Sequence, residues 1–228
     1  MSDSVGSIDE AAVARRLTQL REQLARGARR GPVTLCAVTK GFGADAVSVA
    51  YRLGCDAIGE NYAQEAVAKI AATGAAHPPV HFIGRLQTNK IRSLVGVVDV
   101  WQSVDRESVV DELAKRASGA RIFVQVNATG EPDKGGCQPA DVQQLVERAR
   151  SGGLEVLGLM TVGPTNGDPT GTRRAFAHVR ALADQSDLIG CSMGMSGDVD
   201  IALEEGTTLV RVGTALFGER PQPRDSLR

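Results

Sequence analysis

The stretch VTLCAVTK, residues 33–40, decides how the rest of the chain is interpreted. It is short, apolar and rich in β-branched residues, as is typical of a strand buried on both faces of a parallel sheet. Gly31 and Pro32 precede it, and Gly41 and Gly43 follow it, so turn-forming residues bound it on both sides. We therefore expect the first strand here, with Lys40 at its carboxyl end.

Seven comparable runs follow at intervals that suit strands. They are DAIGEN near residue 58, VHFIG near 82, VVDVWQSV near 100, ARIFVQVN near 123, LEVLGLMTV near 158, LIGCSMG near 190 and TTLVRVGT near 210. Helical patterns separate them over residues 44–53, 63–72, 88–94, 106–117, 139–150, 172–184 and 199–205. A further helix is expected over residues 8–26, with Ser7 able to cap its first turn.

Strict alternation of strands and helices predicts a parallel sheet, and eight units in one domain-sized chain predict a closed (β/α)8 TIM barrel. The helix over residues 8–26 is then an addition at the N-terminus. A doubly wound open sheet is the alternative fold. We expect residues 1–228 to form one domain, with residues 1–7 and 221–228 frayed.

Composition narrows the class of protein. The 228 residues are 42% hydrophobic and 23% charged, which is ordinary for a globular domain. The 26 basic and 27 acidic side chains nearly balance, so neither nucleic acid nor a membrane is an expected partner. The four cysteines, Cys36, Cys55, Cys137 and Cys191, form no CxxC pair. Free thiols, together with no signal-peptide pattern, predict a cytoplasmic protein without disulfides.

Lys40 is the first candidate for chemistry, because a lysine at a strand's carboxyl end lies at the mouth of a barrel, where active sites form. A lysine among apolar neighbours can supply a neutral amine that condenses with a carbonyl compound to a Schiff base. The structural alternative is a lysine that reaches solvent or pairs with a carboxylate, and for a lone lysine this is the commoner case.

Two glycine- and hydroxyl-rich loops are the second candidate. Gly213 and Thr214 end the eighth strand, and the stretch CSMGMSGD offers Ser192, Ser196 and the glycines between and after them. Loops after the last two strands of a barrel recurrently bind phosphate. The same residues could instead serve only as turns and caps, and Ser196 could cap the next helix.

Arg211 and Asn61 complete the predicted site. Arg211 precedes Gly213 by two residues and so shares its face of the strand, where an inward arginine needs an anion or an acceptor. Opposite a pyridine nitrogen, the guanidinium would donate to that nitrogen and oppose its protonation. Asn61 ends the second strand, where its amide could bond a ring hydroxyl or the Schiff base, or could cap the following helix.

Other chemistries find no support in the sequence. His77, His81 and His178 lack metal-ligand spacing, and His81 inside VHFIG is expected to be packed or hydrogen-bonded in its strand. No GxSxG elbow, Walker loop or strand-following GxGxxG pattern occurs.

Six motifs together resemble the pyridoxal phosphate homeostasis protein family, which is related to the alanine racemase barrel domain. They are AVTK, IGENYAQE, HFIGRLQTNK, GLMTV, SMGMSGD and VRVGTALFG, and they span nearly the whole chain. The resemblance implies pyridoxal 5′-phosphate as cofactor, with Lys40 carrying the Schiff base, Ser196, Gly213 and Thr214 holding the phosphate, and Arg211 facing the pyridine nitrogen. Two departures are Thr39, where a serine is expected, and Arg85, where proline or histidine is more familiar.

The expected role is that of a carrier or regulator of cellular pyridoxal phosphate, with no catalytic residue assigned. Alanine racemases of this type use a second acid–base group opposite the lysine, and Tyr51 and Tyr62 are the only tyrosines here. Apo forms of pyridoxal phosphate-dependent enzymes are the candidate recipients, and the chain is expected to be a monomer. The alternatives are a racemase acting as a lone barrel and a Schiff-base aldolase acting on a phosphorylated sugar.

Overall fold

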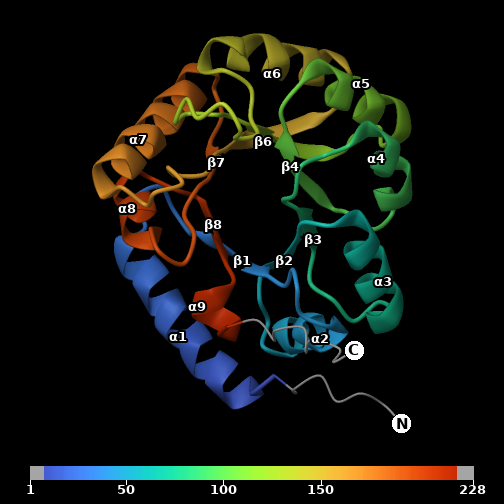
Figure 1. The fold of residues 1–228 in the computed structure, drawn as a ribbon, viewed down its shortest axis with the longest axis vertical. Helices are drawn as coiled ribbons and strands as arrows, with labels where there is room; N and C mark the ends of the chain where they lie inside the picture. Colours follow the sequence, from blue (N-terminus) through green and yellow to red (C-terminus); the bar gives the residue numbers. More distant parts are fainter. Residues whose placement is uncertain (1–7, 220–228) are drawn as a thin grey trace, which may run out of the picture.

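Strand β1, Thr34–Val38, pairs in parallel with β2, Ala57–Glu60, on one side and with β8, Leu209–Val212, on the other. That last pairing closes the sheet. The computed structural model describes residues 8–219, and within them the order β1 to β8 forms a closed barrel ringed by helices (Figure 1). The other strands are β3 (Val80–Phe82), β4 (Val100–Val104), β5 (Arg121–Gln125), β6 (Glu155–Met160) and β7 (Gly190–Ser192). The predicted fold is confirmed.

The helices follow their strands around the outside of the barrel (Figure 1). They are α2 (Ala44–Arg52), α3 (Ala63–Thr73), α4 (Thr88–Leu94), α5 (Glu107–Arg116), α6 (Val142–Ser151), α7 (Pro169–Gln185), α8 (Val199–Glu204) and the short α9 (Thr214–Phe217). The predicted N-terminal helix is present as α1, Glu10–Gly27, and it packs beside α8 and α9.

Three helix starts differ from the sequence prediction. The cap of α1 is Asp9, whose carboxylate accepts from the amide of Ala12, whereas Ser7 lies outside the described residues. Helix α7 begins at Pro169, earlier than predicted, because Asp168 caps it and a proline suits the first helical position. The segment Pro139–Asp141 is a turn of 3₁₀ helix ahead of α6.

The barrel is filled as well as covered. One small cluster joins Cys36, Ala57, Val100, Phe123, Met160 and Leu209, which come from six different strands. Side chains from strands so far apart around a closed ring meet only in its interior, so this cluster is the barrel's own core. Two larger clusters pack the helices onto the outer face of the sheet. The interior is thus filled with side chains, and in such barrels the ligand site forms at the carboxyl ends of the strands.

All four cysteines are buried and free. Burial raises the pKa of the Cys36 and Cys137 thiols to about 12, which leaves them protonated and unreactive.

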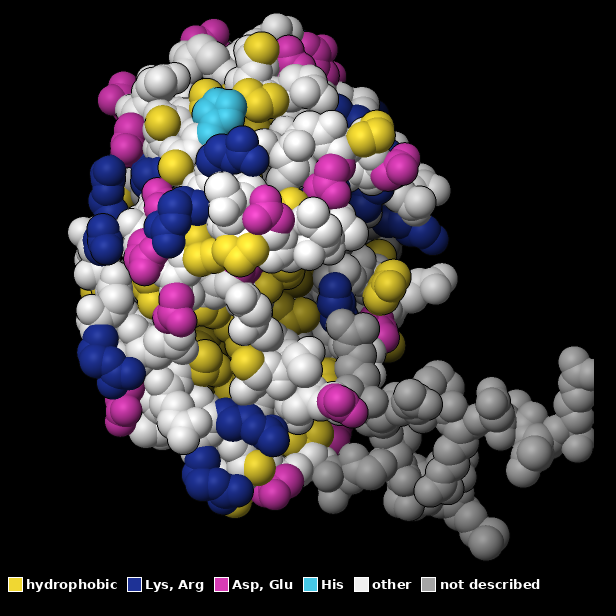
Figure 2. Space-filling model, turned by 60° about the vertical axis from the view of Figure 1, so that its left-hand side comes forward, with side chains coloured by type: hydrophobic (Ala, Val, Ile, Leu, Met, Phe, Trp, Pro, Cys, Tyr) yellow, Lys and Arg dark blue, Asp and Glu magenta, His cyan; other side chains and the backbone are white. Residues whose placement is uncertain are grey.

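Among residues 8–219 no helix is both long and apolar enough to cross a membrane. Acidic and basic side chains are interspersed over the face shown in Figure 2, as the balanced composition predicts. The predictions for residues 1–7 and 221–228 lie outside the described chain.

Candidate functional site

One cavity at the carboxyl ends of β1 and β8 brings together five of the six predicted site residues. It has a volume of about 260 Å³. Its lining comprises Lys40, Ser196, Arg211, Gly213 and Thr214, with Val38, Phe42, Ile83, Met195 and Gly197. We call it the lysine cavity. An amine, a guanidinium, a hydroxyl and main-chain groups therefore face one small volume, although they come from three separate segments.

The turn that carries Lys40 is held by a buried network of charged groups. Lys69 on α3 donates from Nζ to the carbonyl oxygen of Thr39 and to Glu60 Oε1, each at 2.8 Å. Thr39 Oγ1 donates to the same Glu60 oxygen at 2.5 Å. Glu65 accepts from the amide of Gly41 at 3.3 Å. The residues on both sides of Lys40 are thus anchored to α3. Threonine replaces the expected serine at position 39, but it still provides a hydroxyl that can donate this bond.

Sequence reasoning missed this network. Glu60 is fully buried and Lys69 is 5% exposed, so the pair lies in a low-dielectric environment. Burial raises the pKa of the Glu60 carboxyl, although the bonds from Lys69 and Thr39 oppose that change. Its Oε2 atom is buried without a hydrogen-bond partner among residues 8–219. The sequence did contain a clue, because Glu65 and Lys69 have the i, i+4 spacing of a helical ion pair.

The guanidinium of Arg211 is held in place by hydrogen bonds to main-chain and side-chain acceptors. Its Nη1 donates to the carbonyl oxygen and the Oγ of Ser192, at 2.7 and 2.5 Å, and its Nη2 donates to the carbonyl oxygen of Thr161 at 2.7 Å. The side chain is buried, which lowers the guanidinium pKa to about 10, and it still stays charged at neutral pH. These bonds use three of the five N–H donors of a guanidinium. Two donors remain for a ligand.

A chain of hydrogen bonds continues from Arg211 through the barrel interior. Ser192 Oγ donates to Gln102 Oε1 at 2.6 Å, and Gln102 Nε2 lies 2.6 Å from His81 Nδ1. Burial lowers the pKa of His81 to about 4, so the ring is neutral and Nδ1 accepts from the Gln102 amide. His81 is therefore a hydrogen-bonded strand residue, as predicted. Residues 8–219 contain no cluster of His, Cys, Asp and Glu that could hold a metal ion.

Ser196 joins the last two loops at the far wall of the lysine cavity. Its Oγ accepts from the main-chain amide of Ala215 at 3.2 Å, which leaves the hydroxyl proton free to be donated to an anion. Ser196 does not cap α8: the cap position is Asp198, whose carboxylate accepts from the amide of Met195 at 2.5 Å. Gly194 must be glycine, because its φ is +104° and an added Cβ would lie 2.7 Å from the Ala202 side chain.

Asn61 lies in a neighbouring cavity of about 460 Å³. Its side chain does not cap α3, whose cap position is Tyr62. Its Oδ1 is buried without a hydrogen-bond partner among the described residues. The two cavities share a wall, since Ile83 lines the lysine cavity and the flanking Phe82 and Gly84 line the other. We call the second one the Asn61 cavity.

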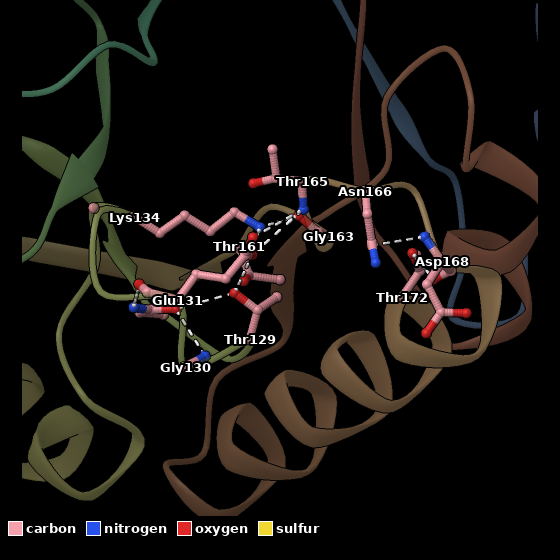
Figure 3. Close-up of polar contacts among 12 residues, drawn as sticks. Thr129, Gly130, Glu131, Lys134, Thr161, Gly163, Thr165, Asn166, Asp168 and Thr172 are labelled. Atoms are coloured by element: carbon pink, nitrogen blue, oxygen red, sulfur yellow. Dashed lines mark hydrogen bonds and ion pairs between the residues drawn. The ribbon is translucent and has the colours of Figure 1, made fainter.

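The loops after β5 and β6 are tied together at the rim (Figure 3). Lys134 donates to the carboxylate of Glu131 and to the carbonyl oxygen of Gly163. Glu131 also accepts from the Thr129 hydroxyl at 2.8 Å and from the Thr165 amide at 3.3 Å. These donors lower the pKa of the Glu131 carboxyl to about 2, so it stays ionised. The two loops thus form one unit that we call the rim clamp.

The fold and the site define a class of protein: a (β/α)8 barrel of the alanine racemase N-terminal domain type, with a lysine, an arginine and a serine lining one cavity at the carboxyl ends of its strands. The family model described as "Alanine racemase, N-terminal domain" matches residues 8–221. Within that class, the chain belongs to the pyridoxal phosphate homeostasis protein family. The relative of that name from Aquifex aeolicus is 41% identical over 75% of this chain and 79% of its own length. The one from Pseudomonas aeruginosa is 38% identical over 91% and 94%, respectively.

Solved structures agree with this assignment. PipY of Synechococcus elongatus with PLP bound is 34% identical, with a TM-score of 0.80 over 90% of this chain and all of that one. Alanine racemase of Corynebacterium glutamicum has a TM-score of 0.73 at 19% identity, and this chain covers 64% of it. The second likeness concerns the barrel fold alone.

Proposed function

We propose that this protein binds pyridoxal 5′-phosphate in the lysine cavity, as a Schiff base on Lys40, and acts in pyridoxal phosphate homeostasis as a carrier. The observation that carries the proposal is the convergence of an amine, a buried guanidinium and a hydroxyl on one cavity. Family membership supports the same ligand, because relatives bear that name and PipY was solved with PLP. When bound, the cofactor would supply a reactive aldehyde and a pyridine ring that can delocalise electrons.

Each group of the cavity suits one part of that ligand. Lys40 provides the amine for the aldehyde carbon, and its flanking anchors at Thr39 and Gly41 hold that amine in place. Ser196 and the main chain at Gly213 and Thr214 provide neutral donors for the phosphate. A larger residue than Gly213 would crowd β1 at this wall, since an added Cβ would lie 3.3 Å from the carbonyl oxygen of Val38.

Arg211 favours a carrier over an enzyme. A guanidinium that remains charged would donate to the pyridine nitrogen of a bound cofactor and oppose its protonation, which would make the ring a weaker electron acceptor. The tyrosines do not supply a second base in the lysine cavity: Tyr51 is 50% exposed on α2, and Tyr62 is 63% exposed in the Asn61 cavity. Cytoplasmic location, a monomeric state and apoenzyme recipients stay predictions, as does a role for Asn61 toward the cofactor.

The first test is the absorption spectrum of the protein reconstituted with pyridoxal 5′-phosphate, before and after borohydride reduction, followed by mass mapping of the modified lysine. We expect a near-visible band that borohydride abolishes and an adduct on Lys40. The Lys40→Ala variant should lose both, whereas Lys115→Ala, which removes an exposed lysine of α5, should keep both. An adduct on another lysine, or none, would overturn the proposal.

The carrier assignment needs its own test. We expect no exchange of the Cα proton of any amino acid for deuterium above the rate given by free pyridoxal 5′-phosphate at the same concentration. Lys40-dependent exchange would instead establish the racemase alternative. Aldol cleavage of a phosphorylated sugar without added cofactor would establish the aldolase alternative.

A further inference from the structure

The Asn61 cavity is larger than the lysine cavity and has its own chemistry. Phe82 and Leu86 line it and are at most 3% exposed, which makes its floor apolar. Arg85 and Lys90 line it as well, exposed and half-buried, respectively. Neither cation has a carboxylate within ion-pair distance anywhere in residues 8–219, whereas the buried or half-buried Lys69, Lys134 and Arg180 each have one.

The third element is the Oδ1 atom of Asn61, which is buried without a hydrogen-bond partner among residues 8–219. A buried acceptor without a donor costs free energy, and such groups are uncommon in folded proteins. The position of Asn61 is constrained, because an added Cβ on Gly84 would lie only 1.9 Å from the Asn61 carbonyl oxygen. The terminal amide torsion of asparagine is soft, so the group can turn toward a ligand at little cost. Its Oδ1 therefore suits a ligand that brings an N–H or O–H donor.

We propose that the Asn61 cavity is a second binding site, for a small organic carboxylate that carries a hydrogen-bond donor next to its carboxylate and an apolar body. The carboxylate pairs with Arg85 and Lys90, the donor bonds Asn61 Oδ1, and the apolar body covers Phe82 and Leu86. Arg85 gives this site one of its two cations, at a position where proline or histidine was expected. The inference is independent of what the lysine cavity binds.

The hydrogen-bond donor of the ligand could be an ammonium or a hydroxyl. A matched series of three ligands distinguishes these two donors. L-leucine, L-2-hydroxy-4-methylpentanoate and 4-methylpentanoate share a carboxylate and an apolar body, and differ in carrying an ammonium, a hydroxyl or neither. Each is titrated calorimetrically into the protein as purified. We expect at least one of the first two to bind about tenfold more tightly than 4-methylpentanoate, because each can donate a hydrogen bond to the buried Asn61 oxygen and 4-methylpentanoate cannot.

Variants locate the binding. Arg85→Met combined with Lys90→Met should weaken it at least tenfold, and Asn61→Leu should remove the preference over 4-methylpentanoate. Lys90→Arg keeps the charge and should bind normally, which separates lost charge from misfolding. Lys40→Ala, at a residue that lines the lysine cavity and not the Asn61 cavity, should also bind normally. Equal binding of all three ligands, no binding at all, or loss in Lys40→Ala with retention in the Arg85 and Lys90 variant would overturn the proposal. None of these outcomes depends on the cofactor band, so failure here is distinct from failure of the proposed function.

Discussion

Lys69 Nζ lies 2.8 Å from the carbonyl oxygen of Thr39, the residue that precedes Lys40. The ammonium of α3 therefore holds the main chain at the lysine cavity, and it neutralises the buried Glu60 carboxylate in the same position. This arrangement couples the stability of the barrel to the placement of the proposed cofactor-binding amine.

Lys69→Met should lower the free energy of unfolding by about 3–5 kcal/mol, because it leaves the Glu60 carboxylate buried and unpaired. Urea denaturation measures this change. The matched control is Arg148→Met, which removes a solvent-exposed pair with Asp111 and should lower the free energy of unfolding far less than Lys69→Met does. Equal effects of the two substitutions would contradict a buried charge network at Glu60.

Double substitution provides a second check on that pair. Lys69→Met with Glu60→Gln removes both charges and should recover part of the stability that Lys69→Met loses. The Schiff-base band should be weakened in Lys69→Met and equally in the double variant, since both lack the bond from Lys69 to the Thr39 carbonyl oxygen. Full recovery of the band would show that Lys69 acts on Glu60 alone.

Acidification should destabilise the protein through His81. Its pKa is 6.5 in the unfolded chain and about 4 in the folded barrel, so the unfolded state binds the proton more tightly. The contribution of the neutral ring is complete above pH 6.5 and is lost as the pH falls from 6.5 to 4. It amounts to about 3 kcal/mol. In urea unfolding measured between pH 4 and 7, the free energy of unfolding of His81→Gln should therefore depend less steeply on pH than that of the unsubstituted protein. An unchanged pH dependence would contradict a buried neutral ring at His81.

Arg211→Lys should destabilise the barrel by about 2 kcal/mol, although it keeps the positive charge. An ammonium cannot reproduce the forked bonds to Ser192 and to Thr161, so at least one buried acceptor is left unpaired. Thermal unfolding measures the loss. If the guanidinium also faces the cofactor ring, the near-visible band should shift in the same variant. An unchanged melting temperature would mean that the guanidinium bonds contribute nothing to folding.

Gly84→Ala should destabilise by about 1–3 kcal/mol, because the new methyl group overlaps the Asn61 main chain. The matched control is Gly197→Ala, where an added Cβ meets no heavy atom within 4 Å. Chemical denaturation distinguishes the two. The Gly84 variant should also lose preference among the three carboxylate ligands, since the wall that positions Asn61 moves.

Glu131→Ala should release the rim clamp without unfolding the barrel. The Thr165 amide loses its acceptor and should exchange with deuterium faster, as measured by NMR. The amide of Gly171, bonded to Asp168 at 2.8 Å in the same segment, is the internal control and should keep its rate. Equal acceleration at both amides would point to general loosening of the loop.

Local patterns in the sequence were enough to determine the barrel, its eight strands and most helix limits. Strand and helix periodicity depend on neighbours along the chain, and a closed parallel sheet is the simplest way to bury eight such strands. The same patterns brought Lys40, Ser196, Arg211, Gly213 and Thr214 to one rim, because strand ends in a barrel share an edge. Helix starts at Asp9 and Asp168 were missed, since a cap depends on which of several nearby polar residues takes the bond.

Only the tertiary structure decided how those residues are held and which of them share a cavity. The bond from Lys69 to Thr39 spans 30 residues, and the bond from Ser192 to Gln102 spans 90. No pattern along the chain reveals such pairs, because their geometry depends on how the helices pack against the closed sheet and how side chains pack inside it. Asn61 is the clearest case: its place at the end of the second strand predicted a position beside Lys40, yet in the folded chain it lines a separate cavity together with Arg85 and Lys90.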